Sequence, residues 1–474
     1  MTASVKLLLL DYWRHNVLRT LSNSRVIRLS AGSILAGILI GLVGGAFRYL
    51  LIVLDHWRDE LIRLAHFWPH IGWLAPVALG LVGAAVARAI VIRFAPLAEG
   101  SGIQHVEAVF SGEAEEAPPT MVPVKFFGGL LALGSGLALG REGPTVQMGA
   151  ALGWVISHKL IHDDQDKKVI GAAGAGAGLA VAFNAPLGGS IFVFEELTGS
   201  ITPWLLVATL AAALVGVWTM RMMLGNGLDF EVRQVSFIEA WRIGPFLALG
   251  ALLGAVGALY NLTVAGLLHF ADRLDRFPHL SSTSRAAIIG AMVGLAAWFA
   301  PAVVGGGNML TQAILADRYA IGGLLNVFLA RFLLGPWSYA AGAPGGLFAP
   351  LLVLGASSGG LFAGVLNHFV PLPGFSPIAF AVVGMAAMFS ASVRAPLTGI
   401  VLTIEMTGRG DLTLGLLGAS LAAMLVAILL QSEPIYETLK RRMLAKASET
   451  SGFVKPPLAS SKPLPRAARA GKAK

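Results

Sequence analysis

The stretch Lys125–Gly153 reads KFFGGLLALGSGLALGREGPTVQMGAALG, and it aligns without a gap on Arg331–Gly359, RFLLGPWSYAAGAPGGLFAPLLVLGASSG. The offset is 206 residues throughout, and a basic residue opens both stretches. Identical residues then stand at Phe126, Gly129, Gly136, Gly140, Pro144, Gly149, Ala150 and Gly153, and at Phe332, Gly335, Gly342, Gly346, Pro350, Gly355, Ala356 and Gly359. Proline, charge and glycine matching in one order indicate an internal duplication.

Three further matches extend the repeat outward at nearly the same offset. Gly100-Ser101-Gly102 aligns with Gly305-Gly306-Gly307, and Ala185-Pro186-Leu187 aligns with Ala395-Pro396-Leu397. Glu195 then meets Glu405. The chain is therefore predicted to hold two related halves, over about 31–225 and 240–432.

The composition indicates that lipid surrounds most of the chain. Of the 474 residues, 55% are hydrophobic and 13% are charged, whereas soluble domains carry about 25% charged residues. The mean hydropathy is +0.73. There is no cysteine, which excludes disulfides, thiolate zinc sites and a cysteine nucleophile. The one acidic loop cluster, around His162 and Asp166, lacks a second set of ligands, so we expect no metal and no cofactor.

Long apolar runs that could each cross a bilayer alternate with stretches cut by glycine and proline. The runs are Ala31–Leu54, Ile71–Ile92, Trp204–Met223, Gly244–Phe270, Arg285–Ala300 and Leu412–Leu430. The interruptions lie near 100–102, 140–144, 184–189, 305–307, 342–350 and 394–399. Transporters use such broken helices to bring helix ends to the middle of the membrane, where the ends bind ions. The sequence therefore predicts an all-α polytopic membrane protein built from broken helices.

Positive charge gathers at both ends of the chain. From Lys440 to Lys474 there are ten Lys or Arg and one acid, Glu449, and the first thirty residues also carry an excess of Lys and Arg. Under the positive-inside rule both termini lie in the cytoplasm. We interpret the basic ends as cytoplasmic segments next to a membrane, in preference to a nucleic-acid binding surface. We expect a cytoplasmic segment over 1–30, a terminal helix over 433–446 and a basic disordered tail over 447–474.

Gly140-Arg141-Glu142-Gly143-Pro144 places a carboxylate at a helix start inside an apolar stretch. Pro144 suits the first turn of a helix, and the free N–H groups of that turn form an anion site. Glu142 could occupy this site as a tethered anion and leave it on protonation, which makes a gate from one side chain. The alternative is a simple salt bridge between Arg141 and Glu142.

Two glycine-rich turns offer donors to an anion. Ser101 in Gly100-Ser101-Gly102-Ile103 offers a hydroxyl, and Gly345-Gly346-Leu347-Phe348-Ala349-Pro350 offers the N–H groups of Leu347 and Phe348. Such donors hold a weakly hydrated anion without trapping it by a full positive charge. Taken singly, either turn favours close helix packing over ligand binding.

Glu195 and Glu196 are adjacent acids in the predicted helix Leu187–Leu197, and the repeat separates their roles. Glu195 has a partner in Glu405, which indicates a shared structural role, whereas Glu196 meets Met406. An acid that only one half possesses at membrane depth is a candidate for carrying protons. The alternative is a solvated acid at the end of a helix.

Lys125 and Glu107 are two more ionisable residues beside apolar runs. We expect them to form a buried pair with a structural role.

These motifs together resemble the CLC family of chloride channels and chloride/proton antiporters, in its bacterial branch, over about residues 31–446. The resemblance implies two inverted-topology repeats of tilted helices, about eighteen in all, and a homodimer with one anion pathway per subunit. It implies that Ser101, Tyr436, Leu347 and Phe348 hold chloride, that Glu142 is the gating glutamate and that Glu196 transfers protons. Glu107, Lys125 and Arg141 are expected to support the site.

The same resemblance places the protein in the bacterial inner membrane and its dimer surface at 187–223 and 396–431. It implies exchange of chloride for protons, with a passive chloride channel as the alternative, and no enzymatic activity. A membrane-embedded hydrolase would need a nucleophile and a base that the sequence does not display. A membrane scaffold would leave the acids at broken helix ends unexplained.

One position departs from the family pattern. The first motif usually ends in proline, and this chain has Gln104, followed by His105. Gln104 is expected to alter the start of the helix or the vestibule on the intracellular side. Ser101 is retained, which favours chloride over nitrate, where proline is usual, and over fluoride, where methionine is usual.

Overall fold

The computed structural model describes residues 24–233, 243–277, 281–369 and 376–451. Over these residues the chain forms seventeen α-helices and, apart from two isolated bridges, no β-structure. Eight helices are long and apolar enough to cross a membrane. The six apolar runs expected from the sequence fall in these helices, which also include two that the sequence reading did not single out, Ile321–Ala340 and Phe348–Phe369.

The helices repeat in the same order in the two halves, as the sequence predicts. The first half holds α2 (Ser24–Ala65), α3 (Leu74–Phe94), α4 (Ile103–Phe110), α5 (Met121–Gly134), α6 (Glu142–Leu160), α7 (Asp164–Phe183), α8 (Pro186–Phe192) and α9 (Pro203–Leu224). The second half holds α10 (Gly244–Leu274), α11 (Ser282–Phe299), α12 (Asn308–Leu315), α13 (Ile321–Ala340), α14 (Phe348–Phe369), α15 (Pro377–Val393), α16 (Pro396–Thr407) and α17 (Thr413–Leu429). The inverted-repeat fold expected from the resemblance is confirmed.

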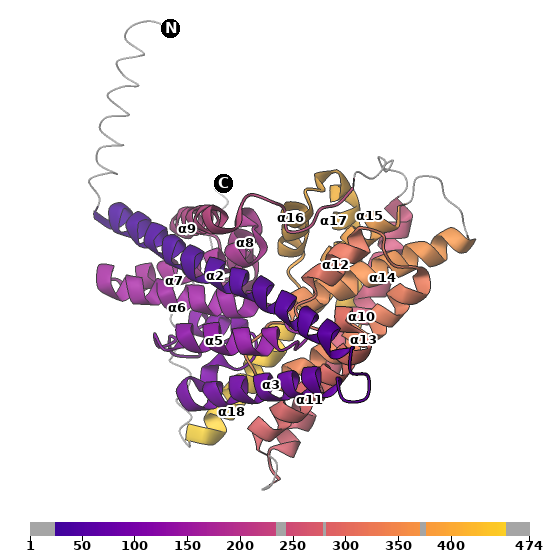
Figure 1. The fold of residues 1–474 in the computed structure, drawn as a ribbon. Coiled ribbons are helices and arrows are strands. Elements are labelled where there is room, and N and C mark those ends of the chain that lie inside the picture. The colour runs from indigo at the N-terminus through magenta and orange to yellow at the C-terminus, as the bar shows by residue number, and fades with distance from the viewer. Residues whose placement is uncertain (1–23, 234–242, 278–280, 370–375, 452–474) are drawn as a thin grey trace, which may run out of the picture.

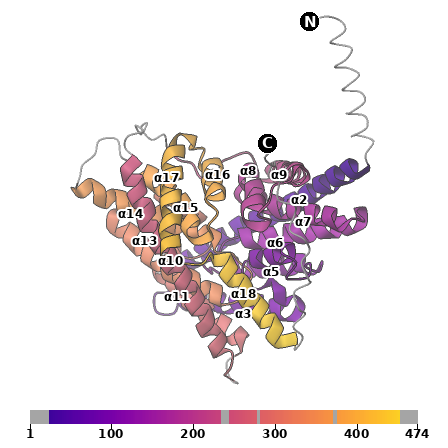
Figure 2. The same cartoon turned by 180° about the vertical axis from the view of Figure 1, so that it is seen from behind.

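The helix α18 (Ile435–Ser451) follows the second half and lies outside the repeat. It begins close to the expected position and continues past 446 to Ser451, and the rest of the tail lies outside the described residues. Residues 1–23 of the expected N-terminal segment also lie outside them. Figure 2 shows α18 crossing the face opposite to that crossed by α2.

The two halves lie side by side (Figure 1) and meet through close helix contacts. Helix α3 packs on α11, and a methyl group on either Gly80 or Gly290 would overlap the other helix's backbone. Helices α8 and α16 also meet across the halves. Glycine is therefore retained in these apolar helices because their backbones touch, as is usual where helices pack in a membrane.

The interruptions expected from glycine and proline are present, and they match between the halves. Proline occupies the first turn of α8 and of α16, where its missing N–H costs nothing. Gly102 precedes α4 with φ +86° and Gly307 precedes α12 with φ +88°, a conformation that favours glycine. The helices are therefore interrupted at equivalent positions in the two halves. Several of the helices that begin after these interruptions form the site described below.

Candidate ion-translocation site

Three breaks in the chain converge at the centre of the molecule, before α4, α6 and α14. Gly140 and Gly346 exchange two backbone hydrogen bonds, with N–O distances of 2.8 and 2.7 Å. Gly345 N donates to Gly100 O at 3.0 Å. The residues that follow these glycines, which include Ser101, Glu142 and Phe348, are thereby fixed close to one another.

The Glu142 carboxylate occupies the start of α14. Its Oε1 accepts from Phe348 N at 2.8 Å and from Ala349 N at 3.2 Å. The side chain is fully buried, and Oε2 has no hydrogen-bond partner in the described part of the chain. A methyl group on Gly140 or Gly346 would overlap this carboxylate, so the glycines leave the space that it fills. A buried carboxylate that accepts hydrogen bonds from two N–H groups at a helix start, and has a second oxygen without a partner, occupies an anion-binding site.

Arg141 does not pair with Glu142, so the simple salt bridge considered from the sequence is wrong. Its guanidinium turns the other way, donating to Ala182 O at 3.0 Å and to Asp229 Oδ2 at 3.1 Å. Asp229 also pairs with Arg48 of α2. Arg141 therefore braces α6 against the end of α7 and leaves the Glu142 carboxylate without a strong ionic partner.

Lys125 holds the turn that carries Ser101. Its Nζ donates to Gly100 O at 2.7 Å and to Ser101 O at 3.0 Å. The repeat mate Arg331 does the same in the other half, donating to the carbonyls of Val303 and Gly305. Since both groups that the Lys125 ammonium contacts are backbone carbonyls of this turn, Lys125 holds the turn in place and thereby positions Ser101.

The expected pair between Lys125 and Glu107 is wrong. Glu107 Oε1 instead accepts from Lys440 Nζ of α18 at 2.8 Å. Sequence position could not reveal this, because the carbonyls that Lys125 meets become available only when the Gly100–Gly102 turn folds back over it.

The structure brings together Ser101 and Tyr436, the two hydroxyl residues that the resemblance assigns to chloride. Both side chains are fully buried, and the Tyr436 hydroxyl lies beside Ser101. Within the described residues this hydroxyl has no partner of good geometry. It also lies near the carboxylates of both Glu142 and Glu196. The Tyr436 hydroxyl therefore has donor capacity that no atom of the described residues uses.

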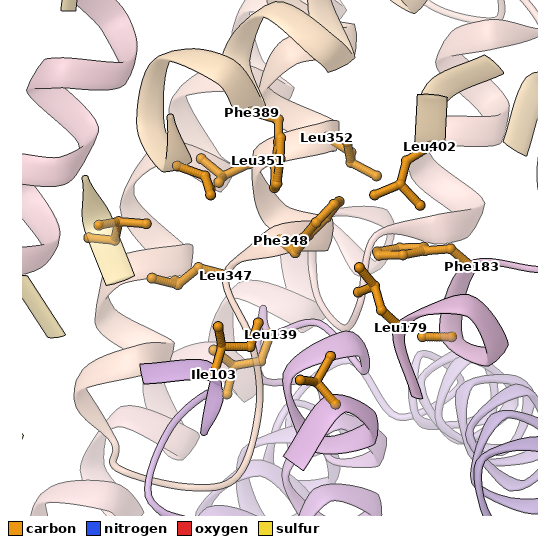
Figure 3. Close-up of a cluster of buried hydrophobic side chains, with 14 of the residues drawn as sticks. Ile103, Leu139, Leu179, Phe183, Leu347, Phe348, Leu351, Leu352, Phe389 and Leu402 are labelled. Carbon is orange, nitrogen blue, oxygen red and sulfur yellow. The ribbon is translucent and has the colours of Figure 1, made fainter. Parts of the chain in front are cut away.

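The side chains around these donors are apolar. Figure 3 shows Leu347, Phe348, Ile103 and Leu139 lying close together; Phe348 and Ile103 begin α14 and α4, and Leu347 and Leu139 lie in the loops before α14 and α6. The ring of Phe348 lies 4.1 Å from that of Phe389 and 4.7 Å from that of Phe183, centroid to centroid. Few polar groups line this region, so each hydroxyl or N–H that faces it acts in a medium of low dielectric constant.

Glu196 is a partly buried acid that lies near Tyr436. It belongs to η2 (Val193–Leu197), a turn of π-helix, whereas the equivalent part of α16 is α-helical. Its charged neighbours include Glu107, Glu195, Lys440 and Glu437. π-turns inside helices occur frequently at functional sites. The repeat therefore loses its symmetry in both residue type and backbone at Glu196.

Ion pairs fix the helix that carries Tyr436. Arg442 of α18 lies 2.7 Å from Asp272 of α10 and 3.3 Å from Glu99 before α4. Glu99 also accepts from Arg88 of α3 at 2.9 Å. Because these partners come from three different elements, α18 is tied to both halves of the molecule.

A cavity of about 250 Å³ lies beside the residues that flank Glu142. Its lining includes Asp55, His56 and Asp59 of α2, together with Gly140, Arg141, Asn308 and Ala349. Since Gly140 and Ala349 both adjoin the Glu142 carboxylate, this cavity approaches the site from the side of α2. Among the described residues, no three His, Asp or Glu side chains are placed to hold a metal ion.

Two residues of the site, Asp229 and Tyr339, were not predicted from the sequence. Asp229 lies in the loop after α9, where no motif marks it. Tyr339 accepts a hydrogen bond from Ser101 N at 3.2 Å. The repeat could have revealed Tyr339, because the residue aligned with it in the first half is the apolar Leu133.

Comparison with known proteins agrees with this arrangement. The sequence model of the voltage gated chloride channel family matches residues 82–428. The chain is 39% identical over 420 residues to the H(+)/Cl(-) exchange transporter ClcA of Vibrio cholerae serotype O1 (strain M66-2). This alignment covers 87% of this chain and 89% of that protein. The crystal structure of a slow cyanobacterial Cl-/H+ antiporter matches with a TM-score of 0.84 at 32% identity, over 88% of this chain and 98% of that one.

A eukaryotic CLC transporter shares the fold, with a TM-score of 0.74 at 23% identity over 89% of this chain and 75% of that one. The family match covers well over half of the sequence, and the relative from Vibrio cholerae aligns over nearly all of the repeat. This chain therefore belongs to the voltage-gated chloride channel family, the CLC proteins.

Proposed function

We propose that this protein exchanges chloride for protons across the bacterial inner membrane, with both termini in the cytoplasm. One observation carries the proposal: the Glu142 carboxylate accepts hydrogen bonds from Phe348 N and Ala349 N. Those N–H groups suit a small anion, and the carboxylate now takes that place. Chloride can bind there once the carboxylate leaves, and protonation makes it leave because a neutral carboxyl gains less from the N–H groups.

The groups that line the anion route favour chloride as the transported anion. The donors at its centre are the hydroxyls of Ser101 and Tyr436 and the N–H groups of Leu347 and Phe348. No lysine or arginine among the described residues points at this position, because Lys125 and Arg141 are both turned toward carbonyls and Asp229. Neutral donors in apolar surroundings select a weakly hydrated anion and still release it.

The proton route supports exchange over passive conduction. Glu196 is partly buried beside Glu107 and Lys440, on a π-turn that the other half of the chain lacks. It offers no donor to an anion when ionised. We therefore assign it to receive protons from the cytoplasm and to pass them toward Glu142, so that the two routes share Glu142 and separate beyond it.

Flux measurements on reconstituted liposomes test this function. Chloride and pH are recorded together while an outward or inward chloride gradient is imposed. A chloride gradient should drive protons against their own gradient in a fixed ratio. Chloride flux with no proton movement would identify a passive channel, and the absence of both fluxes would exclude either function.

A second copy of the chain is proposed to cover the face formed by α8, α9, α16 and α17, over 187–223 and 396–431. The repeat-related residues Leu187 and Leu397 are 53% and 56% exposed there, and Leu214 and Leu425 extend the apolar face. The two halves contribute alike, which suits a two-fold interface. Replacing Leu187 and Leu397 together by Trp should shift the detergent-solubilised protein from dimer to monomer in light scattering. An unchanged mass would place the interface elsewhere.

A further inference from the structure

Lys440 of α18 lies among several acids near Glu196. Its Nζ donates to Glu107 Oε1 at 2.8 Å, and it lies 2.7 Å from Glu437 Oε2 and 4.0 Å from Glu113 Oε1. Lys440 is 7% exposed, so water screens its charge only weakly. One buried lysine is therefore shared by carboxylates from α4, from the loop after α4 and from α18 itself.

Glu107 connects this lysine to Glu196. Helix α4, which carries Glu107, packs against η2, which carries Glu196. Glu107 Oε1 is held by Lys440, whereas Oε2 is buried and has no partner in the described part of the chain. Lys440 thus fixes the Glu107 carboxylate and leaves one of its oxygens able to bind a proton. The titratable groups near Glu196 come from three elements: Glu107 from α4, Glu195 from η2, and Tyr436, Glu437 and Lys440 from α18.

The charge of Lys440 opposes the binding of protons by these acids. Neighbouring carboxylates repel one another, and this repulsion favours proton binding, whereas a cation a few ångströms away favours the ionised carboxylate. Burial alone would lower the pKa of Lys440, but its contacts with Glu107 and Glu437 raise this pKa above its ordinary value. The lysine therefore stays charged, and it counteracts the repulsion at every physiological pH.

We propose that Lys440 is a positioning residue that sets the pH range in which Glu196 takes up protons. It holds Glu107 beside Glu196, and its charge keeps both acids ionised until the pH falls into that range. This inference rests on the proposed function, because it concerns the proton route assigned to Glu196.

Lys440→Met tests the inference, because it removes the charge and keeps an unbranched side chain. Lys446→Met is the matched control, since Lys446 also belongs to α18 but lies 2.6 Å from Asp272 of α10. Lys440→Arg keeps the charge. The full-length proteins are reconstituted in liposomes, and chloride-driven proton flux is recorded at a series of pH values that are equal on both sides. Glu142 is present in every variant, so its own protonation contributes alike to all the curves.

The readout is the pH at which proton flux falls to half of its maximum on the alkaline side. Lys440→Met should move this midpoint to higher pH by about one unit, as expected when a nearby cation is removed from a carboxylate. Lys440→Arg and Lys446→Met should keep the midpoint of the parent protein. Glu437→Gln should move it the other way, by about half a unit, because one acid is lost and the lysine is less compensated.

An unchanged midpoint in Lys440→Met, an equal shift in Lys446→Met, or loss of proton flux at every pH would overturn the inference. A lysine that only tied α18 to α4 would change the size of the flux and not its pH dependence. If Lys440→Met does not fold, Glu437→Gln decides, because the Glu437 side chain is 43% exposed and its loss does not threaten the core. A parent protein without chloride-driven proton flux would instead refute the proposed function.

Discussion

Glu195 and Glu405 each cap a helix in the other half of the molecule. The Glu195 carboxylate accepts from Leu397 N at 3.1 Å and Thr398 N at 2.7 Å, at the start of α16. The Glu405 carboxylate accepts from Leu187 N at 3.1 Å and Gly188 N at 2.7 Å, at the start of α8. The two caps reproduce each other in geometry, which confirms the shared structural role expected from the repeat.

Removing either cap should destabilise the fold and leave coupling intact. Glu195→Gln and Glu405→Gln each lose charge-assisted bonds to a helix start, which should cost about 1–2 kcal/mol of unfolding free energy. The measurement is the unfolding midpoint in detergent, followed by proton and chloride flux in liposomes. The losses from the backbone bonds should be similar, and Glu195→Gln should lose somewhat more because Thr398 Oγ1 also donates to Glu195 at 2.8 Å. A change in the ratio of protons to chloride would show that the caps also take part in transport.

Glu142→Gln should separate chloride movement from proton movement. The neutral amide resembles the protonated carboxyl and no longer competes as an anion for the N–H groups of Phe348 and Ala349. Chloride flux should continue, chloride affinity should rise, and proton pumping should fall to background. Simultaneous recording of both ions in liposomes measures this. Proton uptake that a chloride gradient still drives in this variant would show that the gate lies elsewhere.

Tyr436→Ala should weaken the central site and loosen coupling. The Tyr436 hydroxyl is buried with unused donor capacity beside Ser101, and a hydrogen bond to an ion is worth more than one between neutral groups. Chloride affinity measured by calorimetry should fall about tenfold or more. The number of chlorides moved per proton should also rise. An affinity and a ratio equal to those of the parent protein would remove Tyr436 from the site.

Acid should weaken the tie between Glu99 and α18. Burial alone would raise the pKa of Glu99, but Arg88, Arg442 and Lys446 outweigh burial and lower this pKa from 4.5 to about 2. A lowered pKa in the folded state stabilises the fold above the unfolded pKa of 4.5, and this stabilisation is lost as the pH falls toward 2. The contribution at neutral pH is on the order of 3 kcal/mol.

The test of Glu99 is a series of unfolding midpoints in detergent between pH 7 and pH 3. The parent protein should lose stability below about pH 4.5, where an unfolded glutamate begins to bind protons. Glu99→Gln should start from a lower midpoint at pH 7 and lose less on acidification. Parallel curves for the two proteins would assign the acid sensitivity to other carboxylates.

The repeat made much of this fold predictable from sequence. A nearly constant offset placed matching helix starts at Gly100 and Gly305, and it separated Glu195 from Glu196 before any contact was known. Contacts between side chains and distant backbone were not predictable. Lys125 was predicted to pair with Glu107, because a sequence shows which side chains are charged. It does not show which backbone carbonyls point toward a side chain, and Lys125 in fact donates to two carbonyls. Asp229 was missed for the same reason, since its partner Arg141 reaches it across the fold.

Glu196→Gln should stop proton movement while chloride movement continues. Glu196 has no acidic repeat partner, lies on a π-turn that the other half lacks, and lies near Tyr436. An amide at this position cannot take up and release a proton, whereas the chloride donors Ser101, Tyr436 and Phe348 remain in place. Proton flux should therefore fall to background in liposomes, and chloride flux should stay within about twofold of the parent protein's.

Glu195→Gln is the matched control for Glu196, because it changes the adjacent acid in the same way and should keep both fluxes coupled. The opposite result, with protons stopped by Glu195→Gln and not by Glu196→Gln, would reverse the assignment of the two acids. If both variants keep pumping protons, the proton route leaves Glu142 by another path. The cluster of Glu107, Glu437 and Lys440 near Glu196 is then the next place to test, because Lys440 pairs with both of these acids.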